Sequence, residues 1–100
     1  MPAGSDVRPL LWSNVLNLYD NGEYSAIWGE YENSPKRCLG IRWNGDSDIG
    51  YPNTYGHPSW FVIPDPWVQM ILLDLYMKVS KEPPDGKLEN ILKALAECQK

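Results

Sequence analysis

Two proline-containing breaks in the second half of the chain constrain the fold more than any other feature. Pro64-Asp65-Pro66 opens a helical pattern, because Asp65 is a good N-cap and a proline at the first helical position loses no hydrogen bond. Pro83-Pro84 ends this pattern near Lys81, and a second helical pattern follows over residues 87–99. The short loop between the two patterns predicts a helical hairpin.

The first of these predicted helices carries apolar side chains on two opposite arcs. The core-facing arc holds Val68, Ile71, Leu72, Leu75, Tyr76 and Val79, and the opposite arc holds Met70, Leu73 and Met77. A second apolar stripe requires cover from a second side of the helix. We expect the last helix to supply that cover. If the last helix packs elsewhere, the second stripe becomes an interface with a partner helix or with a second copy of the chain.

The middle of the chain has the alternating pattern of strands. In residues 38–44, the apolar side chains of Leu39, Ile41 and Trp43 share one face. Residues 23–32 predict a partner strand, and the proline-containing turn at 33–37 joins the two in an antiparallel hairpin. Residues 60–63 are apolar on both faces, which predicts a third strand that is fully covered.

The segment before this hairpin has helical spacing instead. Apolar residues recur every three or four positions, at Leu11, Val15, Leu18 and Tyr19, with Trp12 and Leu16 beside them. We therefore predict a helix from residue 8 or 9 to Asp20, after a flexible leader over residues 1–7. The order α-β-β-β-α-α predicts a single α+β domain over residues 8–100, with a small three-stranded antiparallel sheet on which the N-terminal helix and the C-terminal helical hairpin pack.

Charge and cysteine content exclude several classes of function. The net charge is −4 and no cluster of Lys and Arg appears, whereas binding of a nucleic-acid strand requires a concentrated basic face. The two cysteines lack the spacing of a zinc site, and no apolar run approaches the ~18 residues of a membrane span. We expect an acidic cytoplasmic protein without a metal or other cofactor, of a size common among bacterial and phage proteins.

The loop over residues 45–59 is the main candidate for a binding site. Its prolines stiffen the backbone, and tyrosines, tryptophans and arginine together are typical of binding hot spots. The candidate binding residues are Arg42, Trp43, Tyr51, Tyr55, His57 and Trp60. Structural alternatives exist for the same residues, since Arg42 could hold the loop through its carbonyls and the tyrosines could cap one end of the sheet.

No set of residues indicates a catalytic site. Asn44, Asp46 and Asp48 alternate like calcium ligands, but the loop lacks the glycine and the glutamate that an EF-hand requires. Cys38 and His57 could form a nucleophile and base only if the fold brought them together, and nothing in the sequence around Cys38 resembles an oxyanion framework.

These patterns predict a non-enzymatic protein-binding module, such as an inhibitor, an antitoxin-like protein or an accessory subunit, whose partner is another protein. The alternative is a small-molecule or nucleotide-binding protein, monomeric or homodimeric, with its pocket between the end of the sheet and the 45–59 loop. An enzyme with an unrecognised site is the third hypothesis.

Overall fold

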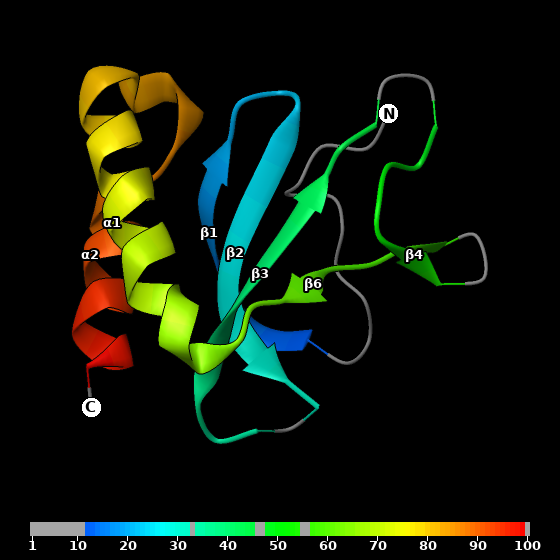
Figure 1. Cartoon of the computed structure of the whole chain (residues 1–100), viewed down its shortest axis with the longest axis horizontal. Helices are drawn as coiled ribbons and strands as arrows, with labels where there is room; N and C mark the ends of the chain where they lie inside the picture. Colours follow the sequence, from blue (N-terminus) through cyan, green and yellow to red (C-terminus); the bar gives the residue numbers. More distant parts are fainter. Residues whose placement is uncertain (1–11, 33, 46–47, 55–56, 100) are drawn as a thin grey trace.

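The computed structural model describes residues 12–32, 34–45, 48–54 and 57–99, so the predicted leader over residues 1–7 lies outside the described part. Strands come first and helices last, and both helices lie on one side of the sheet (Figure 1). The elements are β1 (Trp12–Asp20), β2 (Tyr24–Tyr31), β3 (Arg37–Trp43), β4 (Asn53–Thr54), β5 (His57–Pro58), β6 (Phe61–Val62), α1 (Asp65–Lys81), a 3-10 turn (Pro83–Asp85) and α2 (Leu88–Cys98). Neither described helix is long and apolar enough to cross a membrane.

The main sheet is antiparallel, and its strands lie in the order β1-β2-β3-β6. This confirms an α+β fold with an antiparallel sheet and two C-terminal helices. The sheet has four strands, however, and the prediction of three was wrong because the segment expected to form an N-terminal helix is the edge strand β1. The 45–59 loop also contains β4 and β5, which pair only with each other in a small separate sheet.

The helical spacing of the first segment comes from irregular pairing in β1. The register against β2 shifts twice, between Ser13 and Leu16 and again between Asn17 and Tyr19. Each shift inserts one extra residue, which changes the face that the following side chains take. Val15 therefore packs with the Trp12 cluster on one face, whereas Leu18 and Tyr19 lie in the core under the helices on the other. Asn14, with φ 50°, lies within the first shift. A bulged strand that buries apolar side chains on both faces can thus show the apolar spacing of a helix, and the predicted helix was wrong for this reason.

The hairpin of β2 and β3 is present, and Leu39 and Ile41 share one face as predicted. Ala26 of β2 pairs with Ile41 of β3, and Trp28 pairs with Leu39, so all four side chains point to the helices. Ile27 points to the opposite face. The predicted third strand also exists as β6, but it is an edge strand with Phe61 53% and Val62 37% exposed. The expectation that residues 60–63 are covered on both faces was therefore wrong for these two positions.

Two apolar clusters cover the two faces of the sheet. The larger cluster lies between the sheet and the helices and contains the fully buried Leu18, Leu39, Leu72, Ile91 and Ala94. The smaller cluster lies on the other face and is formed by Trp12, Ile27 and Trp60. Gly40 permits this second cluster, because a Cβ at that position would lie only 3.0 Å from the Trp12 ring.

Helix α1 ends at Lys81 as predicted, and its buried stripe is formed by Val68, Leu72, Leu75 and Val79. The start differs from the prediction by one residue. Pro64 holds the cap position without a side-chain hydrogen bond, and Asp65 lies in the first turn, where a carboxylate faces the positive end of the helix dipole. Tyr76, expected in the core, is 38% exposed.

The second stripe of α1 is not covered. Met70, Leu73 and Met77 are 69%, 46% and 60% exposed, so the expectation that α2 packs over them was wrong. Helix α2 instead packs beside α1 and onto β1, where its buried residues Ile91 and Ala94 join the core under both helices. In this position α2 covers part of the sheet and one flank of α1. The outward-facing side of α1, with Met70, Leu73 and Met77, is left exposed to solvent.

Candidate functional site

Aromatic side chains form two neighbouring rows on the helix-facing side of the sheet. The first row crosses from Tyr24 of β2 to Trp43 of β3 and then to Tyr51, which makes a bridge with Trp43. The second row ends at Phe61, which pairs with Ile41. Cross-strand partners share a face of a sheet, and Ile41 and Trp43 are two positions apart on one strand. The rows are therefore adjacent.

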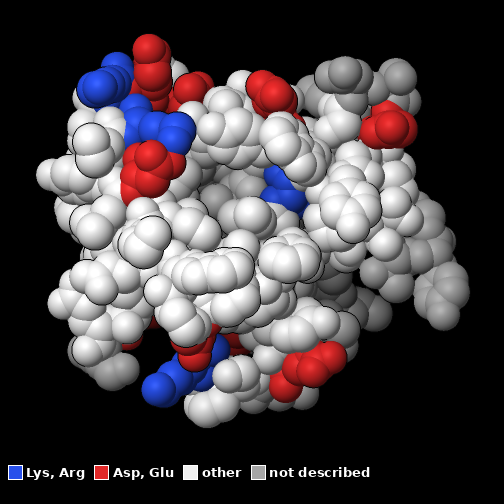
Figure 2. Space-filling model, viewed as in Figure 1, with Lys and Arg blue, Asp and Glu red and all other residues white. Residues whose placement is uncertain are grey.

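Three members of these rows are largely exposed. Trp43 is 53%, Tyr51 65% and Phe61 53% exposed, and we call these three residues the aromatic surface. The ring of Trp43 also meets that of Tyr24 edge-on, with centroids 5.6 Å apart. Figure 2 shows a broad face of the molecule that is mostly uncharged across its middle, with most acidic and basic side chains around its rim. The predicted residues Trp43 and Tyr51 are thus exposed, whereas Phe61 was not predicted.

Arg42 fixes the segment that carries Tyr51. Its side chain is only 3% exposed, and it donates to the carbonyl oxygens of Ile49 and of Ser59, the latter at 2.8 Å. The guanidinium lies 5.9 Å from the centre of the Trp60 ring, and burial lowers its pKa from the ordinary value. Arg42 therefore joins both ends of the 49–59 segment to β3, as the structural alternative for this residue proposed.

Backbone contacts reinforce this arrangement. Trp43 N–H donates to the Tyr51 carbonyl at 2.7 Å, and Tyr51 N–H donates back to the Trp43 carbonyl at 3.0 Å. Gly50 has φ +77°, and a Cβ there would collide with the Trp43 carbonyl oxygen and with the Arg42 guanidinium. Only glycine fits this backbone conformation and this close approach. The backbone of Tyr51 is thus held by its hydrogen bonds with Trp43 and by the close packing of Gly50, although the Tyr51 ring is exposed.

The other predicted binding residues are not part of the aromatic surface. Trp60 is 6% exposed and packs in the cluster with Trp12 and Ile27 on the opposite face of the sheet. Tyr55 lies outside the described residues, and of His57 only the backbone, in β5, is described. The structure therefore brings Trp43 and Tyr51 together, whereas the side chains of Arg42 and Trp60 lie next to each other on the opposite face of the sheet.

A buried polar network, not predicted from the sequence, supports the same end of the sheet. Asn44 is 1% exposed; its amide oxygen accepts from the Ser25 hydroxyl at 2.6 Å, and its amide nitrogen donates to the Asp20 carboxylate at 2.9 Å. These contacts tie the ends of β1, β2 and β3 together. The alternation of Asn44 with Asp46 and Asp48 suggested calcium ligands, but the side chain of Asn44 is already used within the fold.

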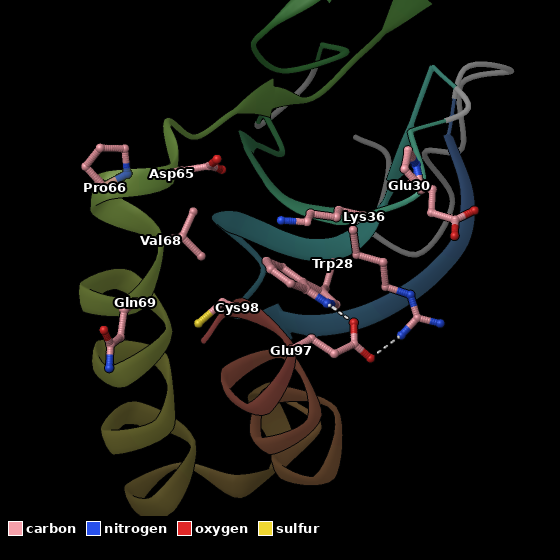
Figure 3. A pocket seen from close by; sticks show the side chains of 11 residues that line it. Trp28, Glu30, Lys36, Asp65, Pro66, Val68, Gln69, Glu97 and Cys98 are labelled. Carbon is pink, nitrogen blue, oxygen red and sulfur yellow. Dashed lines mark hydrogen bonds and ion pairs between the residues drawn. The ribbon is translucent and has the colours of Figure 1, made fainter. Parts of the chain in front are cut away.

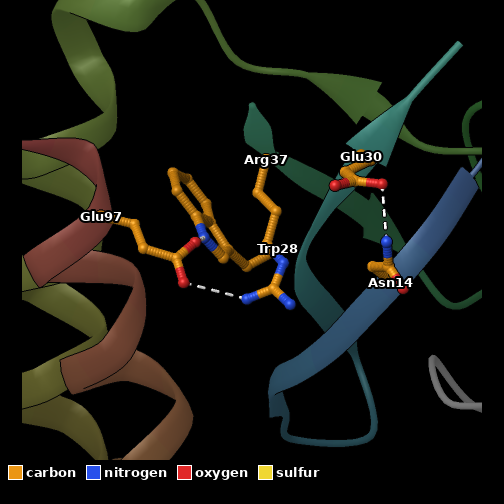
Figure 4. Close-up of polar contacts among 5 residues, drawn as sticks. All are labelled: Asn14, Trp28, Glu30, Arg37 and Glu97. Atoms are coloured by element: carbon orange, nitrogen blue, oxygen red, sulfur yellow. Dashed lines mark hydrogen bonds and ion pairs between the residues drawn. The ribbon is translucent and has the colours of Figure 1, made fainter. Parts of the chain in front are cut away.

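A polar groove lies at the opposite end of β3. It has a volume of about 730 Å³ and is lined by the β2–β3 hairpin, the start of α1 and the end of α2 (Figure 3). Glu97 accepts from Trp28 Nε1–H at 2.7 Å and from the Arg37 guanidinium at 3.0 Å (Figure 4). The sequence-based pocket was expected at the 45–59 loop, which is the other end of the strand.

The groove is poorly suited to acid–base catalysis by its central carboxylate. Both oxygens of Glu97 already accept hydrogen bonds, and Arg37 neutralises its charge. Glu30 is also engaged elsewhere, because it accepts from Asn14 at 2.7 Å (Figure 4). Among the described residues, no group of three or more histidine, cysteine or acidic side chains could hold a metal ion. The hydrogen bonds of Glu97 with Trp28 and Arg37 therefore hold α2 against the hairpin of β2 and β3.

Neither cysteine has the environment of an activated nucleophile. Burial raises the pKa of the Cys38 thiol, and the nearby Asp65 carboxylate raises it further. Burial also raises the pKa of Cys98, whose thiol donates to the Leu95 carbonyl at 3.3 Å. Cys38 contacts the cluster of Trp12, whereas Cys98 contacts the main core, and both are free thiols.

We expect both thiols to react slowly with iodoacetamide, because only the thiolate attacks and a raised pKa lowers its fraction. At pH 7.5 the folded chain should be alkylated at least several-fold more slowly than the chain unfolded in guanidinium. With rising pH, the unfolded rate should level off about one unit above the ordinary thiol pKa of about 8.5, while the folded rate continues to rise. Cys38→Ser and Cys98→Ser variants separate the two thiols, and a folded thiol that reacts at the unfolded rate would contradict the prediction.

Comparison with known proteins gives no relative on which a function could be based. No family model matches the chain, and neither the curated proteins nor the solved structures contain a match. A functional conclusion therefore rests on the geometry of the described residues.

Proposed function

We propose that the chain is a non-enzymatic protein-binding module that contacts another protein through the aromatic surface of Trp43, Tyr51 and Phe61. One observation carries this proposal: three large aromatic side chains, each more than half exposed, lie together at one end of the sheet. Exposed aromatic clusters of this kind mark interaction sites more often than isolated apolar residues do.

The way in which the aromatic surface is held favours binding. Arg42, Gly50 and the Trp43–Tyr51 backbone pair fix the segment before any partner arrives. A fixed segment loses little conformational entropy on association, so more of the contact energy appears as affinity. Tyrosine and tryptophan add large contact area with few rotatable bonds.

The size of the aromatic surface suits the centre of an interface. With roughly 200 Å² for each fully exposed ring, the three half-exposed residues supply on the order of 300 Å². A stable interface buries about 800 Å² from each partner, and its polar rim contributes little energy. The net charge of −4 favours a neutral or mildly basic partner surface.

Replacing Tyr51 by alanine should weaken partner binding at least tenfold with little effect on folding, because the side chain is 65% exposed. A photo-crosslinking amino acid at position 51 would first trap the partner in native extract, with the same group at position 92 of α2 as the control. The purified partner would then be titrated against wild type, Tyr51→Ala, Trp43→Ala and the matched control Leu92→Ala, which changes an exposed side chain on α2.

Two outcomes would overturn the proposal. One is that position 51 traps no protein beyond those trapped from position 92. The other is that the trapped protein binds Tyr51→Ala and Trp43→Ala as tightly as wild type, with all variants shown to be folded by circular dichroism.

A further inference from the structure

The outward-facing side of α1, which we call its crest, carries a line of exposed apolar side chains, which we call the seam. The seam consists of Pro66, Met70, Leu73 and Met77, which follow each other at steps of four, three and four residues. This is the spacing with which one helix presents side chains to another in a coiled coil. All four positions are exposed, and the buried stripe of Val68, Leu72, Leu75 and Val79 occupies the other side of the helix.

The exposed area approaches what a stable contact requires. Five large side chains on the outward-facing part of α1 are between 38% and 69% exposed: Met70, Leu73 and Met77 on the seam, and Trp67 and Tyr76 on its two flanks. With roughly 200 Å² for each such side chain, the three seam residues supply about 350 Å² from one copy and the two flanking residues about 200 Å² more. Two copies that cover the seam and both flanks would bury about 1,000 Å² of these side chains, which is near the lower bound of specific interfaces.

We propose that the crest of α1 binds the crest of α1 of a second copy of this chain, forming a homodimer in which the two helices run antiparallel. A twofold axis requires each helix to meet its own image. In the 17-residue helix Asp65–Lys81, the central residue is Leu73, and the middle of the seam falls between Met70 and Leu73. The axis therefore passes close to Leu73, and the two seams overlap over most of their length.

The helix dipoles of α1 fit this orientation and oppose the parallel one. In an antiparallel pair the two dipoles oppose each other, whereas parallel helices would set ends of like partial charge side by side. Asp65, in the first turn, lines the groove beside β3 and does not reach the seam. Asp74 and Lys78 are paired with each other within one copy, so their charges beside the seam are balanced.

The contact leaves the aromatic surface out of its seam, since Trp43 and Tyr51 belong to the sheet end and not to α1. The seam and the aromatic surface therefore have no residue in common, so substitutions at Leu73 and at Tyr51 test the two proposals separately. The dimer would present two copies of the aromatic surface, and a partner with repeated sites would gain avidity from it.

The decisive measurement is sedimentation equilibrium of the full chain from about 1 to 200 μM, a range that brackets the micromolar affinities of modest interfaces. Wild type should shift from monomer toward dimer across this range. Leu73→Glu should raise the dissociation constant at least about 30-fold, because it buries a charge at the axis. Leu92→Glu is the matched control, since Leu92 is equally exposed at 48% but lies on α2, and it should dimerise like wild type.

Cysteine cross-linking tests the orientation, in a chain with Cys38→Ser and Cys98→Ser. Leu73→Cys should form a disulfide between copies. Met77→Cys should not, because antiparallel helices set the two positions about 12 Å apart along the axis, beyond the roughly 7 Å that a disulfide spans. A monomer at every concentration, or a dimer unaffected by Leu73→Glu, would overturn the proposal. Efficient cross-linking at position 77 would overturn the antiparallel arrangement.

Discussion

Replacing Arg42 by alanine is expected to lower the free energy of unfolding by about 3 to 5 kcal/mol. The side chain is 3% exposed, and its removal leaves the carbonyls of Ile49 and Ser59 without their donor beside an empty volume next to Trp60. Both carbonyls are partly buried, and each that loses its partner costs up to about 1 to 3 kcal/mol. Urea denaturation measures the change, and amide exchange should become faster in the 49–59 segment.

Two further substitutions separate the roles of the Arg42 side chain. Arg42→Met keeps most of the volume but none of the donors, so it should recover only the packing part of the loss. Arg42→Lys keeps the charge but cannot reach two carbonyls with the fixed geometry of a guanidinium, so it should fall between wild type and alanine. A loss below about 1 kcal/mol for Arg42→Ala would show that the loop is held by other contacts.

The elements that could be predicted are those whose pattern has only one physical explanation. The alternation of Leu39, Ile41 and Trp43 indicates a strand, and the prolines at 64, 66, 83 and 84 limit where helices can begin and end. These signals are local, and the structure confirms the hairpin and both helices. The spacing of Val15, Leu18 and Tyr19 has two explanations, because a bulged strand that is buried on both faces can place apolar residues at the same spacing as a helix. Pairing with β2 decides between them, and pairing is not a local property.

The candidate site was predictable in composition but not in exposure. The loop and its flanks contain several aromatic residues, and the structure exposes Trp43 and Tyr51. Trp60 has the same chemistry but is buried, because it faces the cluster of Trp12 on the other side of the sheet. Phe61 is exposed only because β6 is the edge strand. Which face a residue takes, and whether a further strand follows, depends on topology that the sequence pattern does not contain.

The two stripes of α1 show the same distinction. Both are apolar and both recur at helical spacing, yet only the stripe of Leu72 is buried. The position of α2 decides the difference, because α2 packs on the flank of α1 and onto β1 and leaves the outer crest free. Sequence pattern alone predicts that the second stripe needs a partner, and the structure shows that α2 does not supply it.

Leucines 72 and 73 give a direct test of this assignment, because they are adjacent and chemically identical. Leu72 is 0% exposed at the contact of α1 with the sheet, so Leu72→Ala should cost about 3 to 5 kcal/mol through lost burial and the cavity it leaves. Leu73 is 46% exposed, and Leu73→Ala should cost less than about 1 kcal/mol in the monomer.

The comparison must be made by urea denaturation below about 1 μM, because dimerisation adds stability by mass action at higher concentration. Raising the protein concentration to about 100 μM should then stabilise wild type and Leu72→Ala, but should stabilise Leu73→Ala much less. Equal costs for the two leucines in the monomer would mean that α1 is rotated or covered differently. A concentration effect of the same size in both variants would place the contact between copies away from Leu73, and the packing of α1 on the sheet would stand without the proposed dimer.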